Sequence, residues 1–119
     1  MSDQRLPDYL DHMRQAAADA CGFVDGLSKQ AFLNDKRTQQ AVVMSLVIIG
    51  EAATKVMENY GAFAEAHGQV PWRNMRGMRN RIAHGYFDIN LDLVWDTVQS
   101  ALPALLQELA SVRYDAEQA

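Results

Sequence analysis

Cysteine is almost absent from this 119-residue sequence, and its single copy, Cys21, has no partner for an internal disulfide. Cys21 falls within an apolar stripe, which favours a core position over a reactive thiol. The most apolar stretch, residues 41–50, is interrupted by Ser45 and is far shorter than the roughly 20 residues that span a bilayer. The first residues lack the basic and apolar regions of a signal peptide. These absences predict a reducing, cytoplasmic location without membrane contact.

Linkers and strand patterns are also missing. No stretch is rich enough in Gly, Pro or Ser to divide the chain, and no segment alternates long enough between apolar and polar residues to predict a strand. With 49% hydrophobic and 22% charged residues, the composition is that of a single folded domain covering residues 1–119. The net charge of −4 argues against broad nonspecific binding of nucleic acid, although a local basic patch can act through its own field.

Apolar residues instead recur at three- and four-residue steps, which is typical of amphipathic helices. Ser28, Asn34 or Asp35, and Asn90 are suitable N-caps, and Pro103 should kink or divide the last helix. Gly61 and Gly68 mark a short connection. The predicted fold is an all-α bundle of four main helices plus short helical turns, with the main helices over about 6–27, 34–60, 71–83 and 91–109.

The predicted helix over 34–60 is apolar on nearly every side. Outside its main stripe, Met44, Val47 and Ile48 make the other faces apolar as well. A helix that is apolar all round is normally buried all round. We therefore expect this helix at the centre of the bundle, with a second subunit as one way to cover its outer side, which predicts a homodimer.

Glu51 stands in the most apolar part of this central helix. A buried carboxylate needs a charged partner, and Arg79 or Arg81 is the predicted one. A structural salt bridge and a supporting role for a functional arginine are both open interpretations. Gly50 beside it is small enough to let another helix approach closely.

A basic segment without any acid lies in the second half of the chain. No Asp or Glu occurs from residue 66 to residue 87. This segment carries a formal charge of +4, and the rest of the chain therefore carries −8. Its four arginines, together with His84 and Tyr86, predict an anion-binding site, because arginine matches phosphate oxygens and histidine exchanges protons near neutral pH. The arginines lie within nine positions: Arg73, Arg76, Arg79 and Arg81.

Helical geometry separates two of these residues. At 100° per residue, Arg79 and His84 lie about 140° apart around the helix, whereas Asn80 and His84 share a face. The two could meet if the helix unwinds near Gly85, if the Arg79 side chain wraps around it, or if a two-fold dimer brings two copies into one cleft. The dimer is the interpretation that we favour, because isologous dimers are the commonest assembly.

Each residue also has a simpler interpretation. His84 could be a partner of the helix dipole, Tyr86 a half-buried aromatic, and the arginines a solvated helix face. Trp72 could stack a base, although a tryptophan at the start of a helix is more often a core anchor. The sequence predicts no metal site, because its histidines show no metal-ligand spacing with one another or with the cysteine.

The residues from Arg79 to Tyr86 resemble the Arg-x4-His-x-Tyr motif of the HEPN superfamily, specifically the HepT-like toxins. The similarity covers roughly residues 35 to 110. It includes the segments Ile48-Ile-Gly-Glu-Ala-Ala53, Val70-Pro-Trp-Arg-Asn-Met-Arg-Gly-Met-Arg-Asn80 and Arg81-Ile-Ala-His-Gly-Tyr-Phe87.

The resemblance implies a homodimeric HEPN-type bundle in the prokaryotic cytoplasm. It further implies a metal-independent endoribonuclease, a hydrolase without cofactor, that is the toxin of a type II or type VII-like toxin–antitoxin pair. Arg79, His84 and Asn80 would be catalytic, with Glu51 in support, and Tyr86 would receive AMP from a minimal nucleotidyltransferase antitoxin. From the charge of the basic segment, the remaining arginines are predicted to bind RNA phosphates: Arg73, Arg76 and Arg81.

A second hypothesis has a different functional class. HEPN-like domains are also found as non-catalytic helical modules that bind a partner nucleotidyltransferase and help to position its substrate. A neighbouring gene for a small nucleotidyltransferase would fit both hypotheses, whereas toxicity on expression would separate them.

Overall fold

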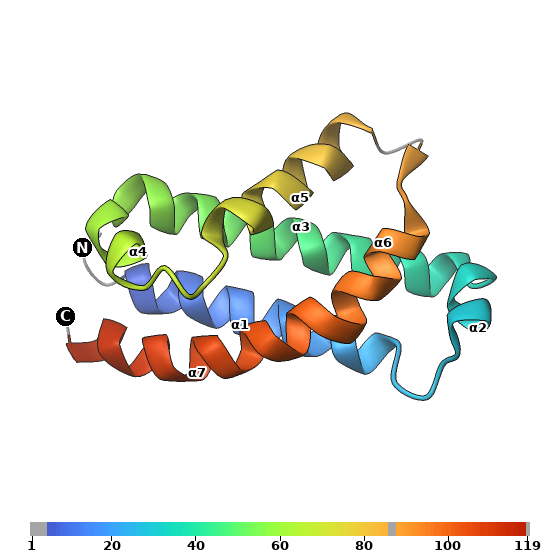
Figure 1. The fold of residues 1–119 in the computed structure, drawn as a ribbon, viewed down its shortest axis with the longest axis horizontal. Coiled ribbons are helices and arrows are strands. Elements are labelled where there is room, and N and C mark those ends of the chain that lie inside the picture. The colour runs from blue at the N-terminus through green and yellow to red at the C-terminus, as the bar shows by residue number, and fades with distance from the viewer. Residues whose placement is uncertain (1–4, 86–87, 119) are drawn as a thin grey trace.

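The computed structural model describes residues 5–85 and 88–118, and in these residues it forms helices and no strands (Figure 1). The prediction of an all-α bundle is confirmed, with four long helices, α1, α3, α5 and α7, joined by shorter ones. The elements are α1 (Arg5–Phe23), α2 (Lys29–Leu33), α3 (Lys36–Asn59), α4 (Gly61–Ala66), α5 (Trp72–His84), α6 (Leu91–Asp96), the π-helical η3 (Thr97–Ala101) and α7 (Leu102–Gln118).

The structure confirms three of the predicted N-caps. The side chains of Ser28, Asp35 and Asn90 each accept a hydrogen bond from the backbone N–H three residues ahead, at 3.0–3.1 Å. Two boundaries differ from the prediction. The first helix ends at Phe23, before a turn in which Gly26 takes a φ of +79°, and the expected connection after Tyr60 contains the helix α4.

The last predicted helix is divided close to Pro103, as expected. The Leu102 N–H bonds to the Thr97 carbonyl five residues back, which makes the π-helical turn. Pro103 follows directly and has no N–H of its own to donate. The helical direction therefore changes between α6 and α7, which Figure 1 shows as a bend in the orange and red ribbon.

The core lies where α1 packs against α3 and α7. Its largest fully buried side chains come from all three helices and include Leu10, Met13, Ile49, Leu105 and Leu109. Arg113 of α7 also donates to the Asp11 carboxylate of α1 at 2.8 Å, and this hydrogen bond lowers the pKa of Asp11. α5 crosses α3, its main contact, and its C-terminal end stands away from α1 and α7 (Figure 1).

Within a single chain, α3 is central but is not buried on every side. Met44 is 59% exposed and Ile48 is 41% exposed, because no other helix among the described residues covers their side of α3. By length and composition α3 is apolar enough to cross a membrane, but half of its most apolar window is buried within the bundle. The core helix of a soluble protein meets the same criterion.

Candidate functional site

The site begins at Gly50, where α5 lies directly on α3. A side-chain carbon at this position would lie 2.7 Å from the Met75 carbonyl oxygen and would overlap the side chain of Arg79. Contacts under 3 Å cannot form without a shift of the helix. The absence of a side chain at Gly50 therefore sets the separation of the two helices and fixes where Arg79 leaves α5.

Arg79 is held by two side chains. Its Nη1 pairs with Oε1 of Glu51 on α3, and its Nε donates to Oδ1 of Asn80 at 2.8 Å. The structure thus places the predicted partner, Arg79 and not Arg81, against Glu51. The expectation that the carboxylate is buried is wrong, since the Glu51 side chain is 54% exposed. An ion pair that exposed adds little to folding stability, so its main effect is to orient the guanidinium.

His84 lies on another side of α5. The helix stays regular to this residue, with the Gly85 N–H bonded to the Arg81 carbonyl at 3.0 Å. Unwinding before Gly85, one of the three ways in which Arg79 and His84 could meet, is therefore not present in α5. No hydrogen bond joins Arg79 to His84 in the part of the chain that the structure describes. Asn80 connects the two sides, because it bonds Arg79 and lies one turn before His84 on the same face.

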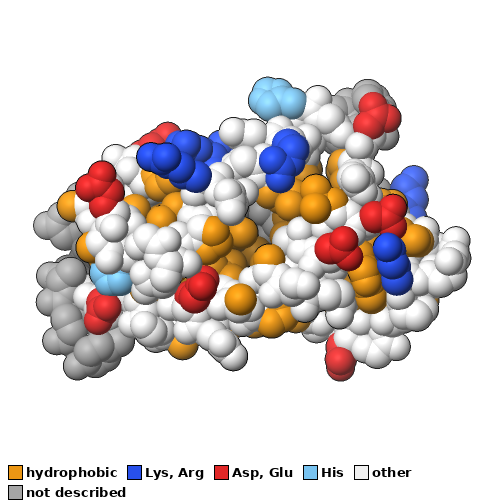
Figure 2. All heavy atoms as spheres, viewed as in Figure 1, with side chains coloured by type: hydrophobic (Ala, Val, Ile, Leu, Met, Phe, Trp, Pro, Cys, Tyr) orange, Lys and Arg blue, Asp and Glu red, His pale blue; other side chains and the backbone are white. Residues whose placement is uncertain are grey.

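The exposed His84 ring lines a pocket of about 400 Å³ between the end of α5 and the start of α6. Much of its wall is apolar, formed by Met78, Ile82, Leu93 and Val94. Arg81 and Asp88 add one charge of each sign to its lining. The hydrophobic surface in the hollow between α5 and α6 is visible in Figure 2.

The remaining predicted arginines are exposed or half-buried on the outer side of α5. Arg73, Arg76, Asn80 and His84 share one face, because they follow a spacing of three or four residues. Within residues 5–85 and 88–118, neither Arg73, Arg76 nor Arg81 makes an ion pair. Figure 2 shows Lys and Arg side chains gathered along the edge formed by α3 and α5.

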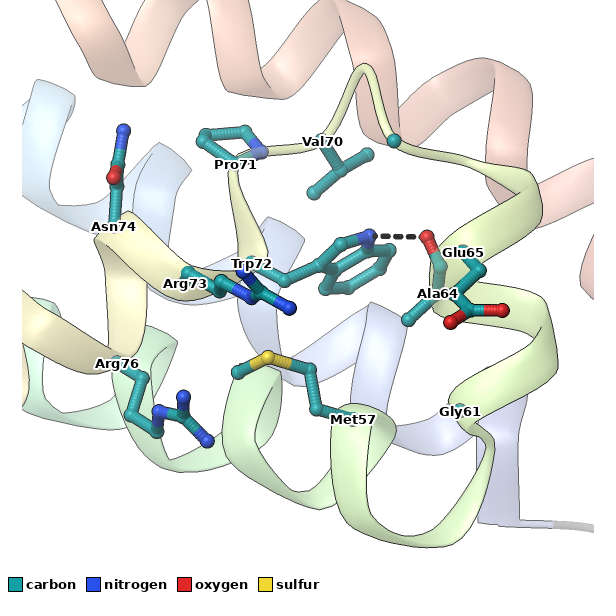
Figure 3. A pocket seen from close by; sticks show the side chains of 11 residues that line it. Met57, Gly61, Ala64, Glu65, Val70, Pro71, Trp72, Arg73, Asn74 and Arg76 are labelled. Atoms are coloured by element: carbon teal, nitrogen blue, oxygen red, sulfur yellow. Dashed lines mark hydrogen bonds between the residues drawn. The ribbon is translucent and has the colours of Figure 1, made fainter.

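Arg73 and Arg76 line a second pocket, of about 490 Å³, between α4 and the first turns of α5 (Figure 3). Trp72 forms its inner wall and is 5% exposed. The indole N–H donates to the carbonyls of Ala64 and His67, each at 3.1 Å. Trp72 is therefore a core anchor, and the alternative of a base stacked on its ring has too little exposed surface.

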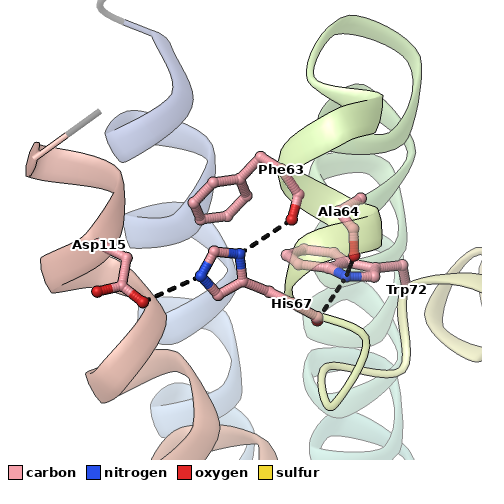
Figure 4. A network of polar contacts seen from close by, with 5 residues as sticks. All are labelled: Phe63, Ala64, His67, Trp72 and Asp115. Carbon is pink, nitrogen blue, oxygen red and sulfur yellow. Dashed lines mark hydrogen bonds and ion pairs between the residues drawn. The ribbon is translucent and has the colours of Figure 1, made fainter.

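His67 forms a polar network that the sequence did not indicate (Figure 4). Its Nδ1 lies 3.0 Å from the Phe63 carbonyl and its Nε2 lies 3.0 Å from Oδ2 of Asp115 on α7. Both partners are acceptors, so the doubly protonated ring satisfies both contacts. The hydrogen bond to the Phe63 carbonyl, together with Asp115, raises the pKa of His67. Asp115 is 48 residues away in sequence, which is why spacing could not reveal the pair.

Three further predictions concern Tyr86, a metal site and Cys21. Tyr86 lies outside the described residues, so the structure places neither its ring nor its hydroxyl. Among the residues that are described, no three His, Cys, Asp or Glu side chains are grouped so that they could hold a metal ion. Cys21 is half-buried, and burial raises the pKa of its thiol, as expected of a structural cysteine.

Comparison with known proteins gives consistent matches. A family model described as "Ribonuclease HepT-like" matches residues 13–112. An inferred RNase of Methanocaldococcus jannaschii is 36% identical over 112 residues, which cover 94% of this chain and 87% of that protein. The "Probable ribonuclease HepT" of Thermococcus cleftensis is 34% identical over 106 residues, covering 89% and 94% respectively. No solved structure matches.

Proposed function

Because the chain belongs to the HepT-like ribonuclease family, as its motif predicted, we propose that it is the toxin endoribonuclease of a toxin–antitoxin pair. One observation carries the proposal for the site. Arg79 is fixed by Glu51 and Asn80, and Asn80 shares its helix face with the exposed His84. A positioned cation and a titratable group on one helix are the two elements that phosphodiester cleavage requires.

The chemistry that we propose needs no protein nucleophile and no metal. The RNA 2′-oxygen attacks the adjacent phosphorus and loses its proton to a base, and the bond from phosphorus to the 5′-oxygen breaks as that oxygen takes up a proton. The products are a 2′,3′-cyclic phosphate and a 5′-hydroxyl. His84 moves the protons, Arg79 stabilises the charge on the phosphorane, and Asn80 keeps the guanidinium in place.

The separation of Arg79 from His84 favours a homodimer within this proposal. One subunit presents Arg79 toward α3 and His84 toward solvent, so a two-fold axis beside α5 would let the Arg79 of one copy serve the His84 of the other. Exposed apolar side chains are available for such an interface, because Met44, Ile48 and Leu93 are each more than 40% exposed. Burial of these side chains would favour association through the hydrophobic effect.

Regulation is the third part of the proposal. A minimal nucleotidyltransferase antitoxin transfers AMP from ATP to the hydroxyl of Tyr86, two residues after His84; the new bond joins the tyrosine oxygen to the α-phosphorus, and pyrophosphate and the hydroxyl proton leave. The added phosphate brings negative charge beside the arginines that attract RNA, and the nucleoside fills space next to the histidine. If this part is right, co-expression with the partner enzyme raises the intact mass by whole AMP units, and Tyr86→Phe abolishes the increase. An unchanged mass contradicts the regulation and leaves the nuclease proposal standing.

Cleavage of RNA in EDTA tests the nuclease proposal. Purified wild-type protein should cut single-stranded RNA under these conditions, and His84→Ala should reduce the rate by about 10²- to 10⁴-fold. His84 is exposed, so the variant should keep its helical circular dichroism. Equal rates for the two proteins, or no RNA cleavage by either, would contradict the proposal. Absence of toxicity for both proteins in cells would then favour the non-catalytic module instead.

A further inference from the structure

The pocket between α4 and α5 has opposite charges on its two sides. Arg73 and Arg76 lie on the α5 side, and the Glu65 carboxylate lies on the α4 side, with Met57 between them (Figure 3). No ion pair joins Glu65 to either arginine among the residues that the structure describes. A ligand that fills this space must therefore carry anionic charge at one end and hydrogen-bond donors at the other.

The pocket is also rigidly built. Trp72 is fixed by its two hydrogen bonds, and one of these goes to the His67 carbonyl. His67 in turn is tied to Asp115 of α7 and stacks on the Phe63 ring at 4.2 Å (Figure 4). The connection between α4 and α5 therefore keeps its shape when the pocket is empty. A preformed pocket of about 490 Å³ lies within the range of small-ligand sites.

The pocket lies on the same helix, α5, as the proposed catalytic residues. Arg76 and His84 share the outer face of the helix and are about 12 Å apart along its axis at 1.5 Å per residue. Asn80 lies between them on the same face. A single RNA strand following this face would pass from the histidine to the pocket within a few nucleotides.

We propose that this pocket is a base-selecting subsite of the ribonuclease and that it prefers guanine. The inference rests on the proposed RNA substrate. Arg73 and Arg76 bind a backbone phosphate, the base lies against the thioether of Met57, and the Glu65 carboxylate accepts from the base edge. Glu65 is thus a specificity-determining residue, which neither the motif nor the charge of the basic segment indicates.

Guanine is the preferred base because of its donors. A carboxylate presents two acceptor oxygens side by side, and guanine offers N1–H and its exocyclic amino group side by side on the Watson–Crick edge. Adenine and cytosine offer one exocyclic amino group next to a ring acceptor. Uracil offers a single N–H between two carbonyl oxygens, which would repel the carboxylate, so it is the base that fits worst.

Cleavage of a random-sequence single-stranded RNA library, in EDTA with sequenced ends, tests the subsite. Wild-type protein should show guanine enriched at one position near the cut. Glu65→Gln keeps the size of the side chain but removes one acceptor oxygen, so the enrichment should fall by roughly fivefold or more. Glu58→Gln, an exposed acid outside the pocket lining, should leave the profile unchanged. An unaltered profile in Glu65→Gln would overturn the proposal.

Substitution of Arg73 and Arg76 should change the affinity for RNA, whereas substitution of Glu65 should change the base preference. Arg73→Gln together with Arg76→Gln should raise KM for RNA without changing which base is enriched, because phosphate contacts carry no sequence information. A changed base preference in this double variant, with none in Glu65→Gln, would overturn the assignment of roles. The exposed Arg37, on the first turn of α3, supplies the matched control as Arg37→Gln.

Binding distinguishes failure of the subsite from failure of the ribonuclease. Fluorescence anisotropy with His84→Ala would compare labelled U8 RNA with an octamer in which one central uracil is replaced by guanine. The guanine-containing octamer should bind roughly fivefold tighter, and Glu65→Gln in the same background should remove the difference. Equal binding of the two RNAs overturns the subsite, whether or not wild-type protein cleaves RNA.

Discussion

Arg79 and Arg73 are separated by fewer than two turns of α5, yet they have different surroundings. Arg79 faces α3, lies against Gly50 and is bonded to Glu51 and Asn80. Arg73 is exposed on the outer face, and no ion pair forms with it among the described residues. The comparison shows how one run of arginines divides into a cation of fixed direction and cations free to follow a flexible anion.

Of the variants that test this difference between the two arginines, Arg79→Lys should have the largest effect on activity. Lysine keeps the charge but loses the planar fork that can bind Glu51, Asn80 and a phosphate at once. We expect kcat for RNA cleavage to fall about 10²-fold or more. Arg73→Gln should instead raise KM and leave kcat nearly unchanged. Steady-state kinetics on one RNA substrate would measure both values, and the reverse pattern would refute the division of roles.

Gly50→Ala should have the next largest effect, because the new methyl group overlaps Arg79 and approaches the Met75 carbonyl oxygen. We expect the free energy of unfolding to fall by about 1–3 kcal/mol, as in other overpacked cores, and kcat to fall with it. Gly22→Ala is the matched control, since Gly22 is also helical and has no neighbour within 4 Å of the added carbon. That variant should be neutral or more stable by about 0.5–1 kcal/mol. A similar loss of stability in both would show that the close crossing is not the cause.

Much of this arrangement could be predicted from the sequence, because its causes are local. Ser28, Asp35 and Asn90 act on backbone groups three residues away, Pro103 acts through its own missing N–H, and the stripe of arginines follows from helical spacing. The need to neutralise a carboxylate in an apolar helix predicted Arg79 or Arg81 as the partner of Glu51, and the structure selects Arg79.

The rest depends on contacts between distant parts of the chain. Periodicity showed that α3 is apolar on all sides, but it does not show which side the other helices leave open. The exposure of Glu51 was therefore missed, and the open side that includes Met44 could not be located from the sequence. His67 and Asp115 meet only because α4 and α7 end at the same end of the bundle (Figure 1). The helix α4 begins at Gly61 itself and ends two residues before Gly68, and these two glycines indicated a connection and not a helix.

Glu51→Gln should have a smaller effect than the two preceding variants. The Glu51 side chain is 54% exposed, so solvent screens its ion pair with Arg79 and the free energy of unfolding should change by less than about 1 kcal/mol. Because the amide still accepts a hydrogen bond, Arg79 should keep most of its orientation, and kcat should fall only a few-fold. Glu51→Ala should cost more in kcat than Glu51→Gln. Thermal unfolding and initial rates measure the two effects, and equal kcat in all three proteins would exclude orientation by Glu51.

The smallest effect concerns pH and the His67–Asp115 pair. Since the pKa of His67 is raised in the folded state, its contribution to stability is complete below the unfolded value of 6.5 and is lost as pH rises through the folded value. Asp115→Asn should reduce this loss, so the melting temperature of the variant should depend less on pH above 6.5. Parallel melting curves for variant and wild type across this range would contradict the assigned protonation of His67.

Subunit mixing tests most directly whether Arg79 and His84 act together across a dimer. Arg79→Ala and His84→Ala would each be purified, unfolded, mixed in equal amounts and refolded, with wild-type protein treated in the same way. If each site takes Arg79 from one subunit and His84 from the other, half of the dimers regain one intact site, and the mixture recovers about a quarter of the wild-type rate. A mixture as inactive as the separate variants, beside a fully active refolded wild type, would contradict the shared site.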